Sequence, residues 1–144
     1  MPLQRNDPVT TGKLYRRIYP DRGTFPRGFN NPPSTQAFET KTGDPGVSVY
    51  LADLVTEDDI MDGHDGFALV SVGAEVILNL EGFSIKYEPK DDERPGQGHS
   101  MIYGPAMPSK RREIARASVL VIAGDPARLP ARFRPPSAIK PDFF

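Results

Sequence analysis

The stretch Gln97-Gly98-His99-Ser100-Met101-Ile102-Tyr103-Gly104 decides how the rest of the chain is arranged. It predicts a strand in which Met101 and Tyr103 alternate with Ser100 and Ile102, after the most polar loop of the chain. The strand ends at Gly104-Pro105, and the clearest helix start follows, with Ser109 as the expected cap. Both of its faces carry apolar side chains and His99 stands at its entrance, which is typical of a central strand that opens onto a cleft.

The chain has 144 residues, which fits one domain that buries about two thirds of its unfolded surface. Most of its 16 prolines lie in the first 45 residues or after residue 125. Proline fixes φ and lacks a backbone donor, so both ends are expected to be extended or turn-rich. We therefore predict an N-terminal arm (residues 1–13), a single α+β domain (14–124) and a proline-rich C-terminal tail (125–144).

Composition favours a soluble cytoplasmic protein that does not act at a membrane. The chain has no cysteine, no apolar leader and no apolar run near the ~20 residues that a membrane span requires. Its net charge of −1 conceals an acidic middle: residues 41–100 hold four basic and thirteen acidic side chains, and both ends are basic. Opposite charges within one chain more often neutralise each other than recruit a partner, although an exposed basic face stays open.

Alternating patterns predict strands at residues 14–19, 47–51, 83–88 and 99–103, and the most apolar run predicts a central strand at 67–72. Helical segments are expected at 34–38, after Thr56 in an imperfect capping box with Asp59, at 74–80 and at 109–118. Residues 119–122 fit either an extension of the last helix or a final strand. We predict an α+β fold: a mixed, mostly antiparallel sheet of about five strands, two or three short helices and proline-rich ends. The basic side chains of the last helix are expected to be mostly solvated: Lys110, Arg111, Arg112 and Arg116.

Several kinds of chemistry are disfavoured by the sequence. The acidic run from Glu57 to Asp65 departs from the calcium-loop template, and two histidines are too few for a typical zinc site, so no metal is predicted. There is no Gly-x-Ser-x-Gly elbow, and His99 and Ser100 should face opposite sides of a strand, which argues against a hydrolase built on those two. No phosphate-loop lysine motif is present.

The segment from Lys13 to Phe29 interleaves four aromatic residues with four arginines. This composition suits nucleic acid or a nucleotide, because bases stack on aromatic rings while guanidinium groups bind phosphates. The alternative is an edge strand that packs its tyrosines and pairs its arginines with the acidic middle. His99 has a similar alternative, a hydrogen bond to a neighbouring loop and no chemical role.

An arginine on an early strand (Arg16 or Arg17), Tyr50 on a later one, and His99 or Ser100 on a third are similar in layout to small ADP-ribosyltransferase-type domains. The resemblance implies that the arginine binds the phosphates of NAD and that the aromatic residue stacks on nicotinamide. The catalytic glutamate of such domains has no clear counterpart, because Glu75 and Glu88 both lack the paired motif.

A broader pattern resembles a group of small bacterial proteins of unknown function, over about residues 14 to 118. It consists of Arg16-Arg17-Ile18, Ser34-x-x-Ala37-Phe38, Val47-Ser48-Val49, Gly66-Phe67, Gly98-His99-Ser100-x-Ile102-x-Gly104 and Arg112-x-x-Ala115. Relatives tend to have alanine on both sides of the histidine. The resemblance implies one compact domain in which His99 lies near the early arginines, and it implies no established activity.

Three functions follow as hypotheses. The first is a bacterial accessory or binding module that recognises a phosphate-bearing ligand or a protein partner through Arg16, Arg17, Tyr50, His99 and Ser100. The second is an enzyme that acts on NAD or nucleic acid with the same residues, of the kind found in toxin-type effectors. The third is a structural protein whose proline-rich ends dock on another chain.

Overall fold

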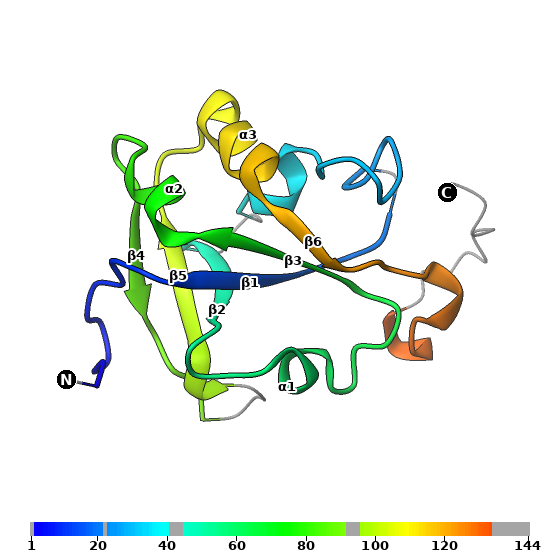
Figure 1. The fold of residues 1–144 in the computed structure, drawn as a ribbon, viewed down its shortest axis with the longest axis horizontal. Helices are drawn as coiled ribbons and strands as arrows, with labels where there is room; N and C mark the ends of the chain where they lie inside the picture. Colours follow the sequence, from blue (N-terminus) through cyan, green and yellow to red (C-terminus); the bar gives the residue numbers. More distant parts are fainter. Residues whose placement is uncertain (1, 22, 41–44, 92–95, 134–144) are drawn as a thin grey trace.

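A computed structural model describes residues 2–21, 23–40, 45–91 and 96–133, and it contains one sheet with helices on both faces (Figure 1). The strands are β1 (Lys13–Ile18), β2 (Val47–Leu51), β3 (Ala68–Gly73), β4 (Ser84–Tyr87), β5 (His99–Tyr103) and β6 (Val119–Ile122). The α-helices are α1 (Glu57–Met61), α2 (Ala74–Leu78) and α3 (Pro108–Ala117). The 3₁₀ turns are η1 (Thr35–Phe38), η2 (Gly96–Gly98), η3 (Pro126–Arg128) and η4 (Ala131–Phe133).

The strands form a six-stranded sheet in the order β4-β5-β2-β1-β3-β6, and each neighbouring pair is antiparallel. The predicted α+β fold with a mostly antiparallel sheet is therefore confirmed. The sixth strand is β6, the segment for which the sequence left helix and strand open. β5 lies between β4 and β2, so it is an inner strand of the sheet.

Local sequence signals account for several element ends. Thr56 and Asp59 form the expected capping box: the Thr56 hydroxyl accepts from the Asp59 N–H at 3.1 Å, and the Asp59 carboxylate accepts from the Thr56 N–H at 3.4 Å. Ser34 accepts from the backbone of Gln36 and caps η1. Gly82 has φ +85°, the left-handed conformation expected after α2.

The start of α3 differs from the prediction. Ser109 does not cap the helix; the N-cap position belongs to Met107 and carries no side-chain hydrogen bond. Pro108 occupies the first helical position, where its missing N–H costs nothing and its fixed φ suits the helix. The cap position therefore lies two residues before the predicted one.

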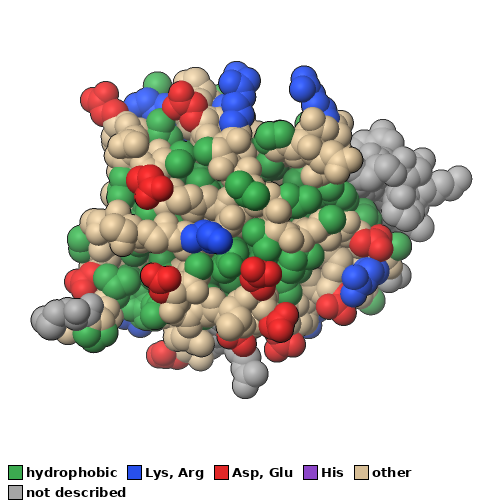
Figure 2. Space-filling view, in the orientation of Figure 1, with side chains coloured by type: hydrophobic (Ala, Val, Ile, Leu, Met, Phe, Trp, Pro, Cys, Tyr) green, Lys and Arg blue, Asp and Glu red, His purple; other side chains and the backbone are tan. Residues whose placement is uncertain are grey.

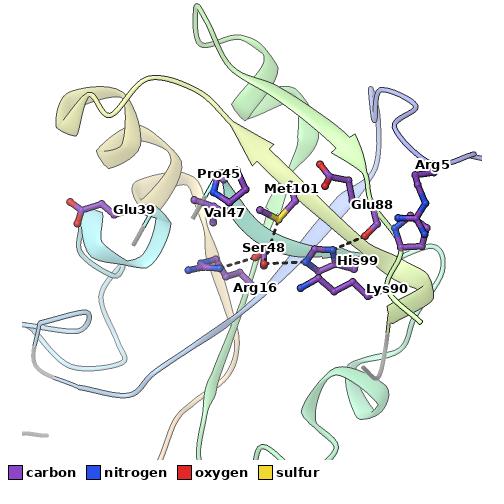
Figure 3. A pocket seen from close by; sticks show the side chains of 12 residues that line it. Arg5, Arg16, Glu39, Pro45, Val47, Ser48, Glu88, Lys90, His99 and Met101 are labelled. Atoms are coloured by element: carbon purple, nitrogen blue, oxygen red, sulfur yellow. Dashed lines mark hydrogen bonds between the residues drawn. The ribbon is translucent and has the colours of Figure 1, made fainter. Parts of the chain in front are cut away.

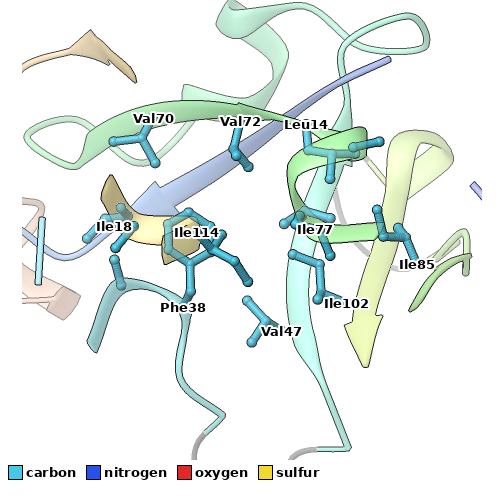
Figure 4. Close-up of a cluster of buried hydrophobic side chains, with 14 of the residues drawn as sticks. Leu14, Ile18, Phe38, Val47, Val70, Val72, Ile77, Ile85, Ile102 and Ile114 are labelled. Atoms are coloured by element: carbon cyan, nitrogen blue, oxygen red, sulfur yellow. The ribbon is translucent and has the colours of Figure 1, made fainter. Parts of the chain in front are cut away.

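The larger hydrophobic core lies between one face of the sheet and the layer formed by α2, α3 and η1 (Figure 4). Ile77 of α2, Ile114 of α3 and Phe38 of η1 are at most 1% exposed and pack on this face. They meet strand residues that include Leu14 and Ile102. This layer fixes which side chains of each strand face inward.

A smaller core covers the opposite face beneath α1. Ile60 of α1 packs there with Tyr15, Tyr50 and Leu69. The exposed side of α1 is acidic, and Figure 2 shows acidic side chains along the lower edge of the molecule, whereas the upper edge carries both basic and acidic ones. No helix within the described ranges is long and apolar enough to cross a membrane.

Residues outside the predicted central domain also pack on the sheet. Pro8 forms an isolated antiparallel bridge with Lys86 of β4, and Val9 is 4% exposed. Leu129, in the predicted tail, is 3% exposed. The rest of that tail, residues 134–144, lies outside the described residues.

Arg111 is buried, which corrects the expectation of a solvated side chain. Its guanidinium donates to the carbonyl oxygens of Phe38 (2.6 Å), Gly104 (3.0 Å) and Pro105 (3.1 Å). It also lies 5.4 Å from the centroid of the Phe83 ring. Burial lowers the pKa of Arg111, and the charge of Glu39 opposes that shift. Arg111 thus joins α3, η1 and the end of β5 through three main-chain carbonyls.

The substitution Arg111→Met keeps most of the volume but leaves three carbonyls without their donor. We expect it to lower the free energy of unfolding by about 3 kcal/mol, measured by urea denaturation. The matched control is Arg112→Met at the exposed neighbouring position, where we expect a change within about 0.5 kcal/mol. Equal losses in the two variants would contradict the bridging role of Arg111.

Candidate functional site

The sheet opens between its two central strands. β1 pairs with β3 along all six of its residues, but it pairs with β2 only at Leu14–Leu51 and Tyr15–Tyr50. In Figure 1, β1, β3 and β6 run across the view, whereas β4 and β5 run steeply down it. Beyond Tyr15 the two halves of the sheet therefore separate, and side chains occupy the space between them.

Arg16 occupies this opening. Its Nη1 donates to the carbonyl of Ser48 at 2.7 Å, and its Nε donates to the carbonyl of Ala37. The guanidinium carbon lies 6.0 Å from the centroid of the Phe38 ring. A side chain thus supplies the Ser48 carbonyl with the donor that the backbone of β1 would otherwise provide.

Arg17, the next residue, points to the opposite face of β1. Its Nη1 donates to the carbonyl of Ile60 at 2.5 Å and its Nη2 to the hydroxyl of Tyr50 at 3.2 Å. The guanidinium lies 5.2 Å from the centroid of the Tyr50 ring, in cation–π geometry. Within the described part of the chain, no carboxylate pairs with Arg17.

A hollow of about 740 Å³ lies at the opening, which is within the size range of small-molecule sites. Arg16, Arg17 and Tyr50 line one part of it. The remaining lining residues come from the end of β1 and the loop after it, from η1, from β2, from the segment between α1 and β3, and from η4: Ile18, Tyr19, Asp21, Thr24, Gln36, Ala37, Ser48, His64, Phe67, Arg132 and Phe133.

This hollow also has an aromatic wall, formed by Tyr19, His64, Phe67 and Phe133. The ring of Phe67 contacts those of Tyr19, His64 and Phe133, with centroids 5.7, 5.3 and 4.9 Å away. The Tyr19 hydroxyl donates to the carbonyl of Phe133 at 2.5 Å, and Arg132 donates to the carbonyl of Gly63 at 2.7 Å. These contacts hold the segment after β6 against the hollow.

A second hollow, of about 460 Å³, shares Arg16 and Ser48 with the first and includes His99 (Figure 3). His99 is 1% exposed, and both of its ring nitrogens are bonded. Nδ1 lies 2.7 Å from the carbonyl oxygen of Glu88, and Nε2 lies 3.1 Å from the hydroxyl of Ser48. The imidazole ring also packs edge-on against Tyr50, with centroids 5.7 Å apart.

Glu88 lines the second hollow and accepts a hydrogen bond from the hydroxyl of Tyr103. Burial, followed by this hydrogen bond and the negative charge of Glu88, raises the pKa of Tyr103 to about 12. Tyr103 therefore stays a neutral donor at neutral pH and holds the Glu88 carboxylate at the edge of the sheet. Glu75, the other glutamate considered from the sequence, lines neither hollow.

The structure brings Arg16, Arg17 and Tyr50 to one hollow, and Arg16 and His99 to the adjoining one. Ser100 is elsewhere: it follows His99 on β5, so it faces the other side of the sheet, fully buried. Its hydroxyl has no hydrogen-bond partner among the described residues.

Two features of the site were missed from the sequence. Ser48 lies two residues before Tyr50 on β2, so alternation along that strand was a usable signal for it. The aromatic wall combines residues that are far apart in the chain, and no local pattern connects Phe67 with Phe133.

Comparison with protein-family models, curated proteins and solved structures finds no match. In the ranges that the structure describes, no group of three or more His, Cys, Asp or Glu is placed to hold a metal ion. The function is therefore argued from the two hollows.

Gly66 holds the segment after β6 in place. It has φ +87°, and a Cβ atom there would lie 2.6 Å from the carbonyl oxygen of Asp125 and 2.7 Å from the backbone nitrogen of Leu129. The Asp125 N–H donates to the Gly66 carbonyl at 2.7 Å. Only glycine permits both the backbone conformation and this close approach.

We expect Gly66→Ala to lower the free energy of unfolding by about 3 kcal/mol in urea denaturation, because backbone strain and a backbone clash combine. The control Gly12→Ala also has positive φ, +102°, but its Cβ would meet only the Asp53 carboxylate, at 3.6 Å. That variant should lose about 1 kcal/mol, from strain alone. Equal losses would show that the approach of residues 125–129 to Gly66 is not needed for stability.

Proposed function

We propose that this chain binds a phosphate-bearing ligand in the hollow between β1 and β2. The observation that carries the proposal is that Arg16 and Arg17, which leave β1 on opposite faces, both line this one hollow. Guanidinium groups bind phosphate oxygens through paired, charge-assisted hydrogen bonds. The separation of β1 from β2 explains why consecutive residues reach the same space.

Arg17 has donors to spare for a ligand. A guanidinium carries five N–H donors, and the Ile60 carbonyl and the Tyr50 hydroxyl take two of those of Arg17. Its charge faces carbonyl and phenol oxygens and not a carboxylate, among the residues described. An incoming phosphate could therefore pair with a guanidinium that no described carboxylate bonds, although Asp21 also lines the hollow.

The aromatic wall favours a nucleotide over a simple phosphate. Phe67, Phe133 and His64 also line this hollow, and aromatic side chains of this kind stack on bases. A volume of about 740 Å³ leaves room for both a phosphate and a planar ring.

The test is isothermal titration of the protein with pyrophosphate, ADP and NAD at two salt concentrations. We expect at least one of them to bind, more weakly at higher salt because screening weakens phosphate contacts. Arg17→Gln should weaken binding at least tenfold, about 1.4 kcal/mol, since it removes the charge but keeps an amide donor for Ile60.

The control for this experiment is Arg112→Gln, an exposed arginine of α3 outside both hollows, which should bind as the wild type does. Thermal denaturation of both variants separates a loss of binding from a loss of folding. Wild-type affinity in folded Arg17→Gln, or no binding of any of the three compounds, would contradict the proposal.

A second candidate is an enzyme that transfers a group from NAD. β5, β2 and β1 are consecutive in the sheet and carry His99, Tyr50 and Arg16, with the His99 and Tyr50 rings 5.7 Å apart. This supports the layout that the resemblance to ADP-ribosyltransferase-type domains implies. Of the two glutamates, Glu88 is the candidate acid, because it lines the hollow of His99.

Chromatographic detection of nicotinamide after incubation with NAD tests this candidate. Release by the wild type and at least tenfold slower release by Glu88→Gln would support transfer chemistry, whereas binding without release would leave the chain a binding module.

A protein partner that presents a phosphate group would use the same arginines. We place this function in the bacterial cytoplasm, in line with the resemblance to small bacterial proteins and the lack of cysteine.

A further inference from the structure

Ser48 and His99 form a hydrogen-bonded pair whose proton positions follow from the partners. The Glu88 carbonyl can only accept, so Nδ1 of His99 carries the hydrogen in the 2.7 Å bond between them. When the ring is neutral, Nε2 then carries the electron pair and faces the Ser48 hydroxyl, 3.1 Å away. The Ser48 hydroxyl, which also donates to Sδ of Met101 at 3.5 Å, can turn its one proton to an imidazole that a third group already orients.

The surroundings of the pair suit a reaction. Ser48 is half-buried and lines both hollows, while His99 lines the second (Figure 3). The guanidinium of Arg16 is bonded to the carbonyl of Ser48 itself, so a positive charge lies beside the hydroxyl. A nucleophile, a base, an orienting acceptor and a cation thus meet at the wall of an open hollow.

We propose that Ser48 is a nucleophile activated by His99, and that the pair hydrolyses a carboxylic ester bound in the second hollow. This site shares Arg16 and Ser48 with the hollow proposed for phosphate binding, but it does not depend on Arg17. Basic side chains outnumber acidic ones around this hollow, which favours an ester that carries a negative group. The basic residues are Arg5, Arg16 and Lys90, and the acidic ones are Glu39 and Glu88.

In the first step, Oγ of Ser48 attacks the ester carbonyl and its proton passes to Nε2 of His99. The bond from the carbonyl carbon to the alkoxy oxygen breaks, and His99 returns the proton to the departing alcohol. Water then attacks the acyl-serine, the Oγ–carbon bond breaks, and a proton from water passes through His99 to Ser48. Arg16 faces the charge that develops on the carbonyl oxygen in both steps.

A fluorophosphonate probe tests the nucleophile directly, because Oγ displaces fluoride from phosphorus and the mass of the chain rises by one adduct. We expect one adduct per chain by intact mass spectrometry, none in Ser48→Ala, and at least tenfold slower labelling in His99→Gln. Ser100→Ala, which changes the buried hydroxyl on the other face of β5, should label as the wild type does. Absence of an adduct on the folded wild-type chain, or an adduct that persists in Ser48→Ala, would overturn the proposal.

A cysteine variant keeps the test independent of the stability of His99→Gln. In Ser48→Cys, a basic imidazole beside the thiol should move the midpoint of alkylation by iodoacetamide below the ordinary thiol value of about 8.5. Ser84→Cys, exposed on β4 and away from any helix N-terminus, is the control and should show the ordinary midpoint. Equal midpoints in the two variants would mean that the Ser48–His99 contact only ties β2 to β5, and would overturn the proposal.

Discussion

The hydrogen-bond ladder between β1 and β2 covers two residue pairs and then stops. Both hollows adjoin the place where it stops, and Arg16 lines both of them. Where a ladder stops inside a sheet, main-chain carbonyls lose their partners and must find others. Arg16 meets this requirement by donating to Ser48 on β2 and to Ala37 on η1. The Arg16 side chain thus supplies hydrogen bonds that are lost where the strands separate. It also brings a positive charge to the space between the strands.

Arg16, Arg17 and Arg111 all donate hydrogen bonds to main-chain carbonyls, but their roles differ. Arg111 is 3% exposed and three carbonyls surround its guanidinium, so it can serve only to hold α3 and η1 together. Arg17 is half-buried and shares two of its donors with the protein. Because a cation in an apolar core must be bonded on all sides, the donors that remain on Arg17 distinguish a binding residue from a structural one.

Much of the fold could be predicted from local patterns. Alternation located β2 and β5, and the Thr56–Asp59 capping box located α1, because these signals are carried by neighbouring residues. The burial of Arg111 and the sixth strand were not predictable in this way. An exposed and a buried arginine on a short helix look alike until the neighbours are known, and four apolar residues after a helix fit either structure.

The site was only partly predictable, for a reason that lies in the register of β2 and β5. Chain neighbours on a strand face opposite sides, so Ser100 could not join His99, whereas the cross-strand register places Ser48 and Tyr50 on the face of His99. The same register buries Val47, Val49 and Ile102 in the larger core.

A slip of one residue in this register would expose those three apolar side chains and bury the polar ones. The hydrophobic core therefore fixes the contact between Ser48 and His99, although neither residue belongs to it. Apolar residues on the reverse face of β2 and β5 determine how these two strands align. The alignment alone then places Ser48 beside His99.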